Sequence, residues 1–274
     1  MIRIVVDSTS EINQEEAKKL NIDVIPLSVT FNQKTFKDQI EIDNGTFYKM
    51  LSESSSLPTT SQPSPEDFYN VFKKYEGDEI VGIFLSSKLS GTFQSAYIAK
   101  NMIENNDNIH LVDSKNATVC ETILIHHAIK LRDANKSAKE ITAELNELVD
   151  RVRLVAYIDT IKYLQMGGRI SGLKAVLANS LNISPLISIE DGAISNLSKV
   201  RSKKKAFSFI SEFINSKPID YNYKVGLAGF DADEEVNKLK ELVNDGDIIV
   251  NELGPVIGTH AGPKAFAIAY IEKK

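Results

Sequence analysis

Short apolar runs alternate with helix-type spacing through the first half of the chain. The runs at residues 2–6, 24–31, 80–85 and 109–112 are rich in β-branched residues. Strands that alternate with helices predict a parallel sheet with helices on its faces, that is, a three-layer α/β domain. The run at 80–85 is apolar throughout, which is typical of a strand buried on both faces of such a sheet.

Capping residues mark where the helices between these runs begin. Ser10, Asp43, Ser64 and Ser137 each precede a helical pattern and are expected to cap it. Residues 52–65 are the longest irregular stretch, because three prolines interrupt them. The helix after the fourth run is expected to carry one apolar stripe, made of Cys120, Ile123, Leu124, His127, Ala128 and Leu131.

The pattern changes near residue 154, where antiparallel pairing begins. Two extended runs at 182–189 and 193–200 are joined by Glu190-Asp191-Gly192, which is a hairpin signal. Three more extended runs follow, at 223–230, 247–253 and 265–271. These runs predict a second α/β domain with a mixed or mostly antiparallel sheet. We therefore divide the chain into an N-terminal domain at 1–154 and a C-terminal domain at 155–274.

Composition narrows the classes of protein that this chain can belong to. It has 274 residues and a formal net charge of −5, which disfavours a nucleic-acid-binding protein. The longest apolar run, at 265–271, is far shorter than the ~20 residues that span a bilayer. The sequence also shows no secretory signal, so we expect a cytoplasmic protein. Cys120 is the single cysteine, which excludes an intrachain disulfide and a cysteine-based zinc site. We expect no bound metal.

Hydroxyl-rich segments follow three of the predicted parallel strands. They lie at residues 7–10, 86–92 and 113–114, and Thr59-Thr60-Ser61 in the proline-rich stretch adds a fourth. Ligands of open parallel sheets bind beyond the carboxyl ends of the strands, so these segments are expected to converge on one crevice. Any one of them alone is better explained as a helix cap. Residues 86–92 are the most specific, because they supply several hydroxyls beside Gly91, which lets a ligand approach the backbone.

Two further residues are candidates to contact an anion. Arg169 follows Gly167-Gly168, and its guanidinium can bind a carboxylate or phosphate with two parallel hydrogen bonds. His260 lies in the glycine- and proline-rich segment 254–263, which we predict to be a loop. An ordinary helix stop and a plain surface histidine are the alternatives. The dense basic run of Arg201, Lys203, Lys204 and Lys205 is either a solvated helix face or a docking patch for an acidic partner.

Known catalytic signatures are absent from the sequence. There is no G-x-G-x-x-G, no P-loop motif, no G-x-S-x-G and no H-E-x-x-H. A serine hydrolase remains an alternative, with Ser90 as nucleophile, His260 as base and Asp7 or Asp113 as the orienting carboxylate.

At these residues the sequence resembles the DegV family of fatty-acid-binding proteins, which includes the acyl-carrying subunit of bacterial fatty acid kinase. The resemblance runs nearly end to end. It rests on Val6-Asp7-Ser8, Thr60-Ser61-Gln62-Pro63-Ser64, Ser86-Ser87-Lys88-Leu89-Ser90-Gly91-Thr92, Val112-Asp113-Ser114, Tyr163-Leu164, Gly167-Gly168-Arg169-Ile170 and His260 before Gly262-Pro263. One departure is Lys264, where the family often has a small residue.

The resemblance implies a soluble carrier that binds a long-chain fatty acid between or beneath two α/β domains and uses no cofactor. The residues that match the family's ligand site are Thr60, Ser61, Ser90, Gly91, Thr92, Arg169 and His260. A kinase subunit would bring ATP and magnesium and phosphorylate the bound carboxylate, while this protein presents it and carries the acyl phosphate into lipid metabolism. Arg201 matches a position linked with docking to that subunit. Transient contact with a membrane surface is compatible with this role. A third hypothesis for the function is a pure interaction module that acts through residues 201–205.

Overall fold

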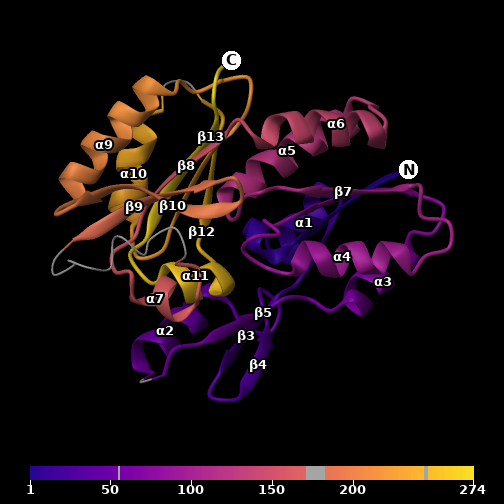
Figure 1. Cartoon of the computed structure of the whole chain (residues 1–274), viewed down its shortest axis with the longest axis horizontal. Helices are drawn as coiled ribbons and strands as arrows, with labels where there is room; N and C mark the ends of the chain where they lie inside the picture. Colours follow the sequence, from indigo (N-terminus) through magenta and orange to yellow (C-terminus); the bar gives the residue numbers. More distant parts are fainter. Residues whose placement is uncertain (55, 171–182, 244–245) are drawn as a thin grey trace.

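The computed structural model describes residues 1–54, 56–170, 183–243 and 246–274, which form an α/β fold with three sheets (Figure 1). The first sheet is parallel and has the strand order β2-β1-β6-β7, which confirms the sheet predicted for the first half. Its strands are β1 (Ile2–Asp7), β2 (Ile22–Ile25), β6 (Glu79–Phe84) and β7 (Ile109–Asp113).

Helices cover both faces of the parallel sheet, as the three-layer prediction requires. Val5 packs towards one face, and Ile4 and Val6 pack towards the other, because successive side chains of a strand alternate. One face carries α3 (Pro65–Lys74) and α4 (Thr92–Asn101), and the other carries α1 (Gln14–Leu20), α5 (Val119–Asp133) and α6 (Ala138–Val149). The predicted caps Ser64 and Ser137 are confirmed, and each forms a full capping box.

The second sheet is mixed, in agreement with the prediction, and has the order β10-β9-β8-β13-β11-β12. Only β11 and β12 of its described strands pair in parallel. Its strands are β8 (Val152–Tyr157), β9 (Ser184–Glu190), β10 (Ala193–Val200), β11 (Val225–Gly229), β12 (Ile248–Glu252) and β13 (Phe266–Ile271). The predicted hairpin joins β9 to β10, with positive φ at Asp191 and Gly192. The start expected for its first strand, Asn182, lies outside the described residues.

Helix α5 lies between the two sheets, and this arrangement changes the pattern of its buried residues. It contacts β1 and β6 of the parallel sheet and β8, β11 and β13 of the mixed sheet. The prediction of a single apolar stripe is therefore wrong for the first part of this helix. Every residue from Val119 to Ile125 is buried, so the helix is covered all round there. The outer face of the mixed sheet is covered instead by α9 (Lys203–Ser216) and α10 (Asp233–Glu241), seen on the left of Figure 1.

The extended run expected at residues 24–31 is two strands in different sheets. Pro26 lacks a backbone N–H, so it ends β2 and redirects the chain. The second strand, β3 (Ser28–Phe31), forms a small antiparallel sheet with β4 (Lys34–Lys37) and β5 (Thr59–Ser61) in the order β4-β3-β5. Edge strand β5 lies inside the stretch expected to be irregular. Helix α2 (Asn44–Glu53), capped by Asp43 as predicted, covers this sheet.

Two local predictions are wrong. Ser10 does not cap α1, because it belongs to a short 3-10 turn, η1 (Ser8–Ser10), and Asn13 caps the helix by accepting hydrogen bonds from the N–H groups of Glu15 and Glu16. The segment around His260 is helix α11 (Pro255–Ala261) rather than a loop. Proline is well tolerated in the first turn of a helix, and Gly262 with φ of 75° ends it.

The proposed division between residues 154 and 155 stays a prediction. It falls within β8, whereas the change from one sheet to the other occurs between β7 and β8. No helix among the described residues is both long and apolar enough to cross a membrane.

Candidate functional site

A cavity of about 370 Å³ lies where the two halves of the fold meet, that is, between the half with the parallel sheet and the half with the mixed sheet. One wall is formed by the inner face of β8, β9, β10 and β13, and another by α11. The third wall is the carboxyl edge of the parallel sheet, beyond β1 and β6. The chain runs from β1 to β2 on one side and later continues from β6 to β7 on the other, so this edge is the topological switch point where open sheets bind ligands.

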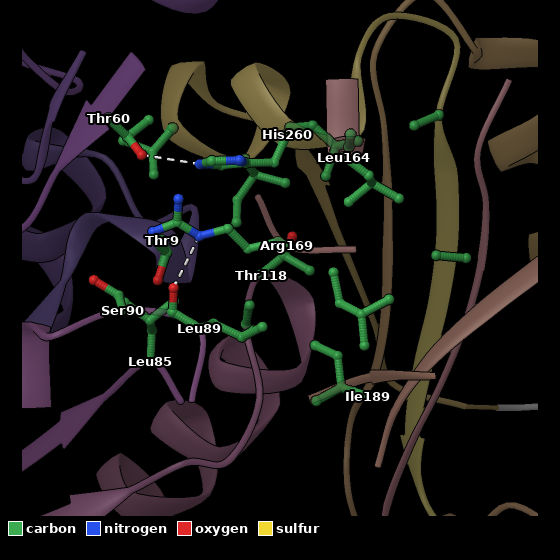
Figure 2. A pocket seen from close by; sticks show the side chains of 18 of the residues that line it. Thr9, Thr60, Leu85, Leu89, Ser90, Thr118, Leu164, Arg169, Ile189 and His260 are labelled. Carbon is green, nitrogen blue, oxygen red and sulfur yellow. Dashed lines mark hydrogen bonds between the residues drawn. The ribbon is translucent and has the colours of Figure 1, made fainter. Parts of the chain in front are cut away.

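The cavity is apolar along most of its length and polar at one end. Figure 2 shows Thr60, His260, Arg169 and Ser90 gathered on one side, with Leu164 and Ile189 on the other. The apolar lining is drawn from both halves of the fold and includes Leu27, Leu85, Leu89, Leu154, Ala156, Ile158, Leu164, Ile187, Ile189, Ile194, Val256, Ile257, Ala265 and Ala267. This shape fits a ligand with a polar head and a long apolar tail.

The polar end joins elements far apart in the sequence. His260 Nε2 on α11 shares a hydrogen bond of 2.9 Å with Thr60 Oγ1 on β5. The guanidinium of Arg169 donates from Nε to Leu89 O at 3.1 Å and from Nη1 to Gly167 O at 2.6 Å. Arg169 follows α7 (Lys162–Met166), so α7, α11, β5 and the loop after β6 meet around one positive charge.

His260 is a neutral imidazole at neutral pH. Burial and, to a smaller extent, the positive charge of Arg169 lower the pKa of His260 to about 4. Its Nδ1 atom is buried without a hydrogen-bond partner among the described residues. The ring lies so close to Gly167 that a Cβ atom there would be 2.1 Å from Nδ1, which explains why the residue is glycine. The alternative interpretation of Gly167-Gly168 as an ordinary helix stop does not account for this contact.

A Gly167→Ala substitution is expected to displace the His260 ring and break its hydrogen bond with Thr60. A distance of 2.1 Å between the added Cβ and Nδ1 is too short for the ring to stay in place. Loss of the bond with local repacking should lower the free energy of unfolding by ~1–3 kcal/mol. NMR of the imidazole nitrogens and urea unfolding measure the two effects. Gly45→Ala is the matched control, because its nearest neighbour would be 3.5 Å away. Unchanged His260 resonances in Gly167→Ala would contradict the prediction.

The loop after β6 holds Ser90 by local hydrogen bonds. Ser90 Oγ lies 2.9 Å from Thr92 Oγ1 and accepts a bond of 3.3 Å from the Thr92 N–H. Ser90, Thr60 and Ser61 line the cavity, whereas Thr92 is fully buried behind Ser90, and Gly91 is not among the lining residues. A Cβ at Gly91 would lie 2.0 Å from Gln62 Oε1, so close packing against Gln62 accounts for this glycine.

Three polar lining residues were not among the predicted site residues. Gln62 follows β5, Thr9 lies in the turn after β1, and Thr118 precedes α5. The hydroxyl-rich segment 7–10 was a signal for Thr9. No sequence signal marks Thr118. In the structure its φ of 55° is unusual for a β-branched residue and indicates backbone strain beside the cavity.

Four buried carboxyl groups lie next to residues of this end of the cavity: Asp7, Glu11, Asp38 and Glu121. Asp7 and Glu121 contact Thr9, Glu11 contacts Thr118, and Asp38 contacts Ser8 beside Thr9. Burial raises the pKa of each, and the pKa values of Glu11 and Glu121 lie well above the ordinary range. No described lysine, arginine or histidine forms an ion pair with any of them, and no group of side chains in the described part of the chain is arranged to hold a metal ion. Some of these four carboxyl groups therefore have to be protonated, which limits the negative charge at this end of the cavity.

Asp38 is expected to make folding less favourable as the pH rises. Burial is the main cause that raises its pKa from 3.8 to about 7. Between these values the folded protein keeps a proton on Asp38 that the unfolded chain has lost. The contribution of Asp38 to the free energy of unfolding therefore falls by up to ~1.4 kcal/mol per pH unit, and it is constant again above pH 7. Urea unfolding at pH 5 and pH 8 should show that Asp38→Asn removes this part of the slope. The exposed Asp107→Asn should not, and equal slopes in both variants would refute the assignment.

The hydrolase alternative is not assembled in the structure. His260 Nε2 contacts Thr60 rather than Ser90, and its Nδ1 has no carboxylate partner in the described ranges. Asp7 accepts from Thr9 and from the Leu85 N–H, and Asp113 accepts from the N–H groups of Ser87 and Lys115. An imidazole with a pKa of about 4 is also a weak general base.

The basic run 201–205 lies away from the cavity, at the turn from β10 into α9. Arg201, Lys204 and Lys205 are exposed, whereas Lys203 forms an ion pair of 2.8 Å with Glu235 on α10. Lys264 has φ of 61° just before β13 and is exposed, and it does not line the cavity.

Comparison with known proteins relates the whole chain to one family. A family model described as an uncharacterised protein of the DegV family matches residues 1–273. A DegV domain-containing protein of Caldanaerobacter subterraneus is 35% identical over 279 residues, which cover 99% of each chain. A fatty-acid-binding DegV family protein of Thermus thermophilus has a TM-score of 0.88 at 30% identity, covering 98% of this chain and 99% of its own. A stearic-acid-binding protein of Eubacterium ventriosum has a TM-score of 0.90 at 26% identity, covering 100% and 99%.

Proposed function

The chain belongs to the DegV family, and on this premise we propose that it binds one long-chain fatty acid in the cavity between its two halves. The observation that carries the proposal is a cavity with a long apolar lining and one polar end around a single arginine. The structural relatives from Thermus thermophilus and Eubacterium ventriosum, described as binding fatty acid and stearic acid, support it. On this proposal the protein binds its ligand in the cytoplasm and catalyses no step itself.

The apolar lining supplies most of the binding energy in this proposal. Each methylene group buried from water contributes ~0.8 kcal/mol, so an acyl chain gains affinity from its length. The alanines on β8 and β13 leave room for the chain, and the isoleucines on β9 and β10 pack against it. The polar end then selects the orientation and the type of head group.

Two hydroxyl groups are arranged to donate to a carboxylate. If neutral His260 donates from Nε2 to Thr60 Oγ1, the Thr60 hydroxyl keeps its own proton for another acceptor. Ser90 Oγ similarly accepts from Thr92, which leaves its proton for the ligand. With the Arg169 guanidinium beside them, these donors favour an ionised carboxylate over an alcohol or ester.

Native mass spectrometry of gently purified protein tests the proposal directly. We expect an adduct with the mass of a long-chain fatty acid, or uptake of one equivalent of added oleate or palmitate. Absence of both would refute fatty-acid binding. Extraction and identification of the bound lipid would then give its chain length and saturation.

We further propose that the bound carboxylate is presented to a kinase subunit that supplies ATP and magnesium, and that this protein carries the acyl phosphate afterwards. The proposal follows from the resemblance to the acyl-carrying subunit of fatty acid kinase. The exposed charges of Arg201, Lys204 and Lys205 in an acidic chain support docking of an acidic partner at this position.

Reversing the exposed charges should separate docking from fatty-acid binding. Arg201→Glu combined with Lys204→Glu is expected to leave oleate binding unchanged and to lower kinase-coupled phosphorylation by ~10-fold or more, mainly through slower association. Lys203 stays untouched because it pairs with Glu235. The matched control reverses Lys18 and Lys139, which are exposed on α1 and α6. Docking at the basic run is ruled out if both double variants are phosphorylated equally well.

A further inference from the structure

The hydroxyl of Thr9 lies between two buried carboxyl groups at the floor of the cavity. Thr9 Oγ1 is 2.5 Å from Asp7 Oδ1 and 2.7 Å from Glu121 Oε2, and none of the three residues is more than 1% exposed. A hydroxyl has one proton to donate, and an ionised carboxylate can only accept. Both contacts are hydrogen bonds only if one of the two carboxyl groups carries a proton.

Hydrogen-bond partners show which group holds that proton. Asp7 accepts from the N–H groups of Thr9 and Leu85 at 2.9 and 2.8 Å and from the Thr9 hydroxyl, so three donors stabilise its ionised form. Glu121 contacts Thr9 alone, and its buried Oε1 has no partner among the described residues. An unpartnered carbonyl oxygen is far less costly than an unpartnered carboxylate oxygen. The hydrogen bonds therefore run from Glu121 Oε2–H to Thr9 Oγ1, and from the Thr9 hydroxyl to Asp7 Oδ1.

The charges around Glu121 also favour its protonated form. The charges of Asp7 at the end of β1, Glu11 after η1 and Asp113 at the end of β7 each raise the pKa of Glu121. Asp38 raises the pKa of Glu11 in the same way, and Asp7 raises that of Asp38. Burial is the largest cause that raises the pKa of Glu121. The Thr9 hydroxyl would lower it only by donating to Glu121, and that proton is donated to Asp7 instead. Arg169, the positive group at this end, lines the cavity together with Thr9 (Figure 2).

We propose that Glu121 is a protonated positioning residue, which fixes the Thr9 hydroxyl beneath the head-group site and keeps a further negative charge away from a bound carboxylate. This inference rests on the proposed binding of a fatty acid. Because an anionic ligand and an ionised Glu121 repel each other, binding favours the protonated form. By linkage, the affinity for a carboxylate is highest while Glu121 holds its proton and falls as the pH rises and removes it.

Oleate binding by the full-length protein, measured by calorimetry from pH 6 to pH 9.5, tests the coupling. Wild-type affinity is expected to fall on the order of tenfold across the titration of Glu121. Glu121→Gln should bind oleate at pH 6.5 much as the wild type does and lose this pH dependence, because its amide donates to Thr9 and cannot ionise. Glu121→Leu should bind more weakly at every pH, because nothing then donates to Thr9.

Two matched variants and a spectroscopic measurement keep the outcomes distinct. Glu11→Gln and Asp38→Asn change neighbouring buried carboxyl groups that do not touch Thr9. Each should remove only the effect of its own titration and keep the part of the pH dependence that Glu121 causes. Infrared difference spectra of ligand-free wild type and Glu121→Gln at pH 7 should show the carbonyl stretch of one protonated carboxylic acid. The proposal is overturned if that band is missing, if Glu121→Gln keeps the wild-type slope, or if Asp38→Asn removes it. The band together with no oleate uptake at any pH would overturn fatty-acid binding and the positioning role, and leave only the buried proton.

Discussion

Ala267→Phe is expected to lower the affinity for a C16 or C18 fatty acid by ~100-fold or more while the protein stays folded. Ala267 on β13 pairs with Ala156 on β8, and both line the apolar part of the cavity. A phenyl ring at this position occupies space that an acyl chain needs. Excluding about four methylene groups removes ~3 kcal/mol of burial, which corresponds to ~150-fold in affinity. Titration with oleate or palmitate measures the loss.

A substitution by phenylalanine outside the cavity is the control for this change. Val250 on β12 is 47% exposed, so Val250→Phe adds an aromatic ring without filling the cavity and should bind oleate as the wild type does. Circular dichroism and thermal unfolding check that both variants fold. A shorter acid, such as octanoate, should be affected less by Ala267→Phe than oleate is. Equal oleate affinity in Ala267→Phe and the wild type would mean that the chain lies elsewhere.

Features with a local cause could be predicted from the sequence. The capping boxes at Ser64 and Ser137 depend on residues three positions apart, and the hairpin turn at Asp191-Gly192 depends on two adjacent residues that tolerate positive φ. The parallel sheet followed from the alternation of apolar runs and helices. Each signal lies within one element, so no knowledge of tertiary packing was needed.

Features that depend on distant packing could not be predicted in the same way. The helix stripe predicted at residues 120–131 describes a helix covered on one face, but α5 is enclosed by two sheets. Gly258 looks like a loop residue in the sequence, yet in α11 it allows the ring of Tyr48 to come close, because a Cβ there would be 2.5 Å from the Tyr48 hydroxyl. The stretch 59–61 gains its strand character only from pairing with β3.

The candidate site shows the same division. Loops after parallel strands share one edge of a sheet, so the convergence of the segments with Thr9 and Ser90 follows from topology. The hydrogen-bond partners within the site do not follow from topology. Nothing in the sequence indicates that His260 contacts Thr60 two hundred positions away, or that Thr9 is shared by Asp7 and Glu121. The protonation states of these groups depend on burial, which one sequence does not display.

Arg169→Met is expected to weaken oleate binding by ~10- to 150-fold and to leave binding of oleyl alcohol almost unchanged. Among the described residues that line the cavity, Arg169 alone carries a permanent charge, since His260 is neutral at pH 7. A hydrogen bond to a charged group contributes ~1.5–3 kcal/mol, and an alcohol does not gain this charge-assisted part. Methionine keeps the apolar length of the side chain. The ratio of the two affinities, measured for wild type and variant, isolates recognition of the carboxylate from burial of the chain.

Arg169 also stabilises the fold through its hydrogen bonds to backbone carbonyls. The control variant therefore has to lose comparable hydrogen bonds. Arg132 donates to the backbone carbonyls of Asn21 and Leu20 much as Arg169 donates to those of Leu89 and Gly167, but it lies outside the cavity. Arg132→Met should therefore lower stability without changing the ratio of oleate to oleyl alcohol affinity. Because Arg169 helps to lower the pKa of His260, an NMR titration should find a higher His260 pKa in Arg169→Met and no change in Arg132→Met. If both variants lose oleate and oleyl alcohol equally, Arg169 acts through stability alone, and the carboxylate must be bound by the hydroxyl groups without it.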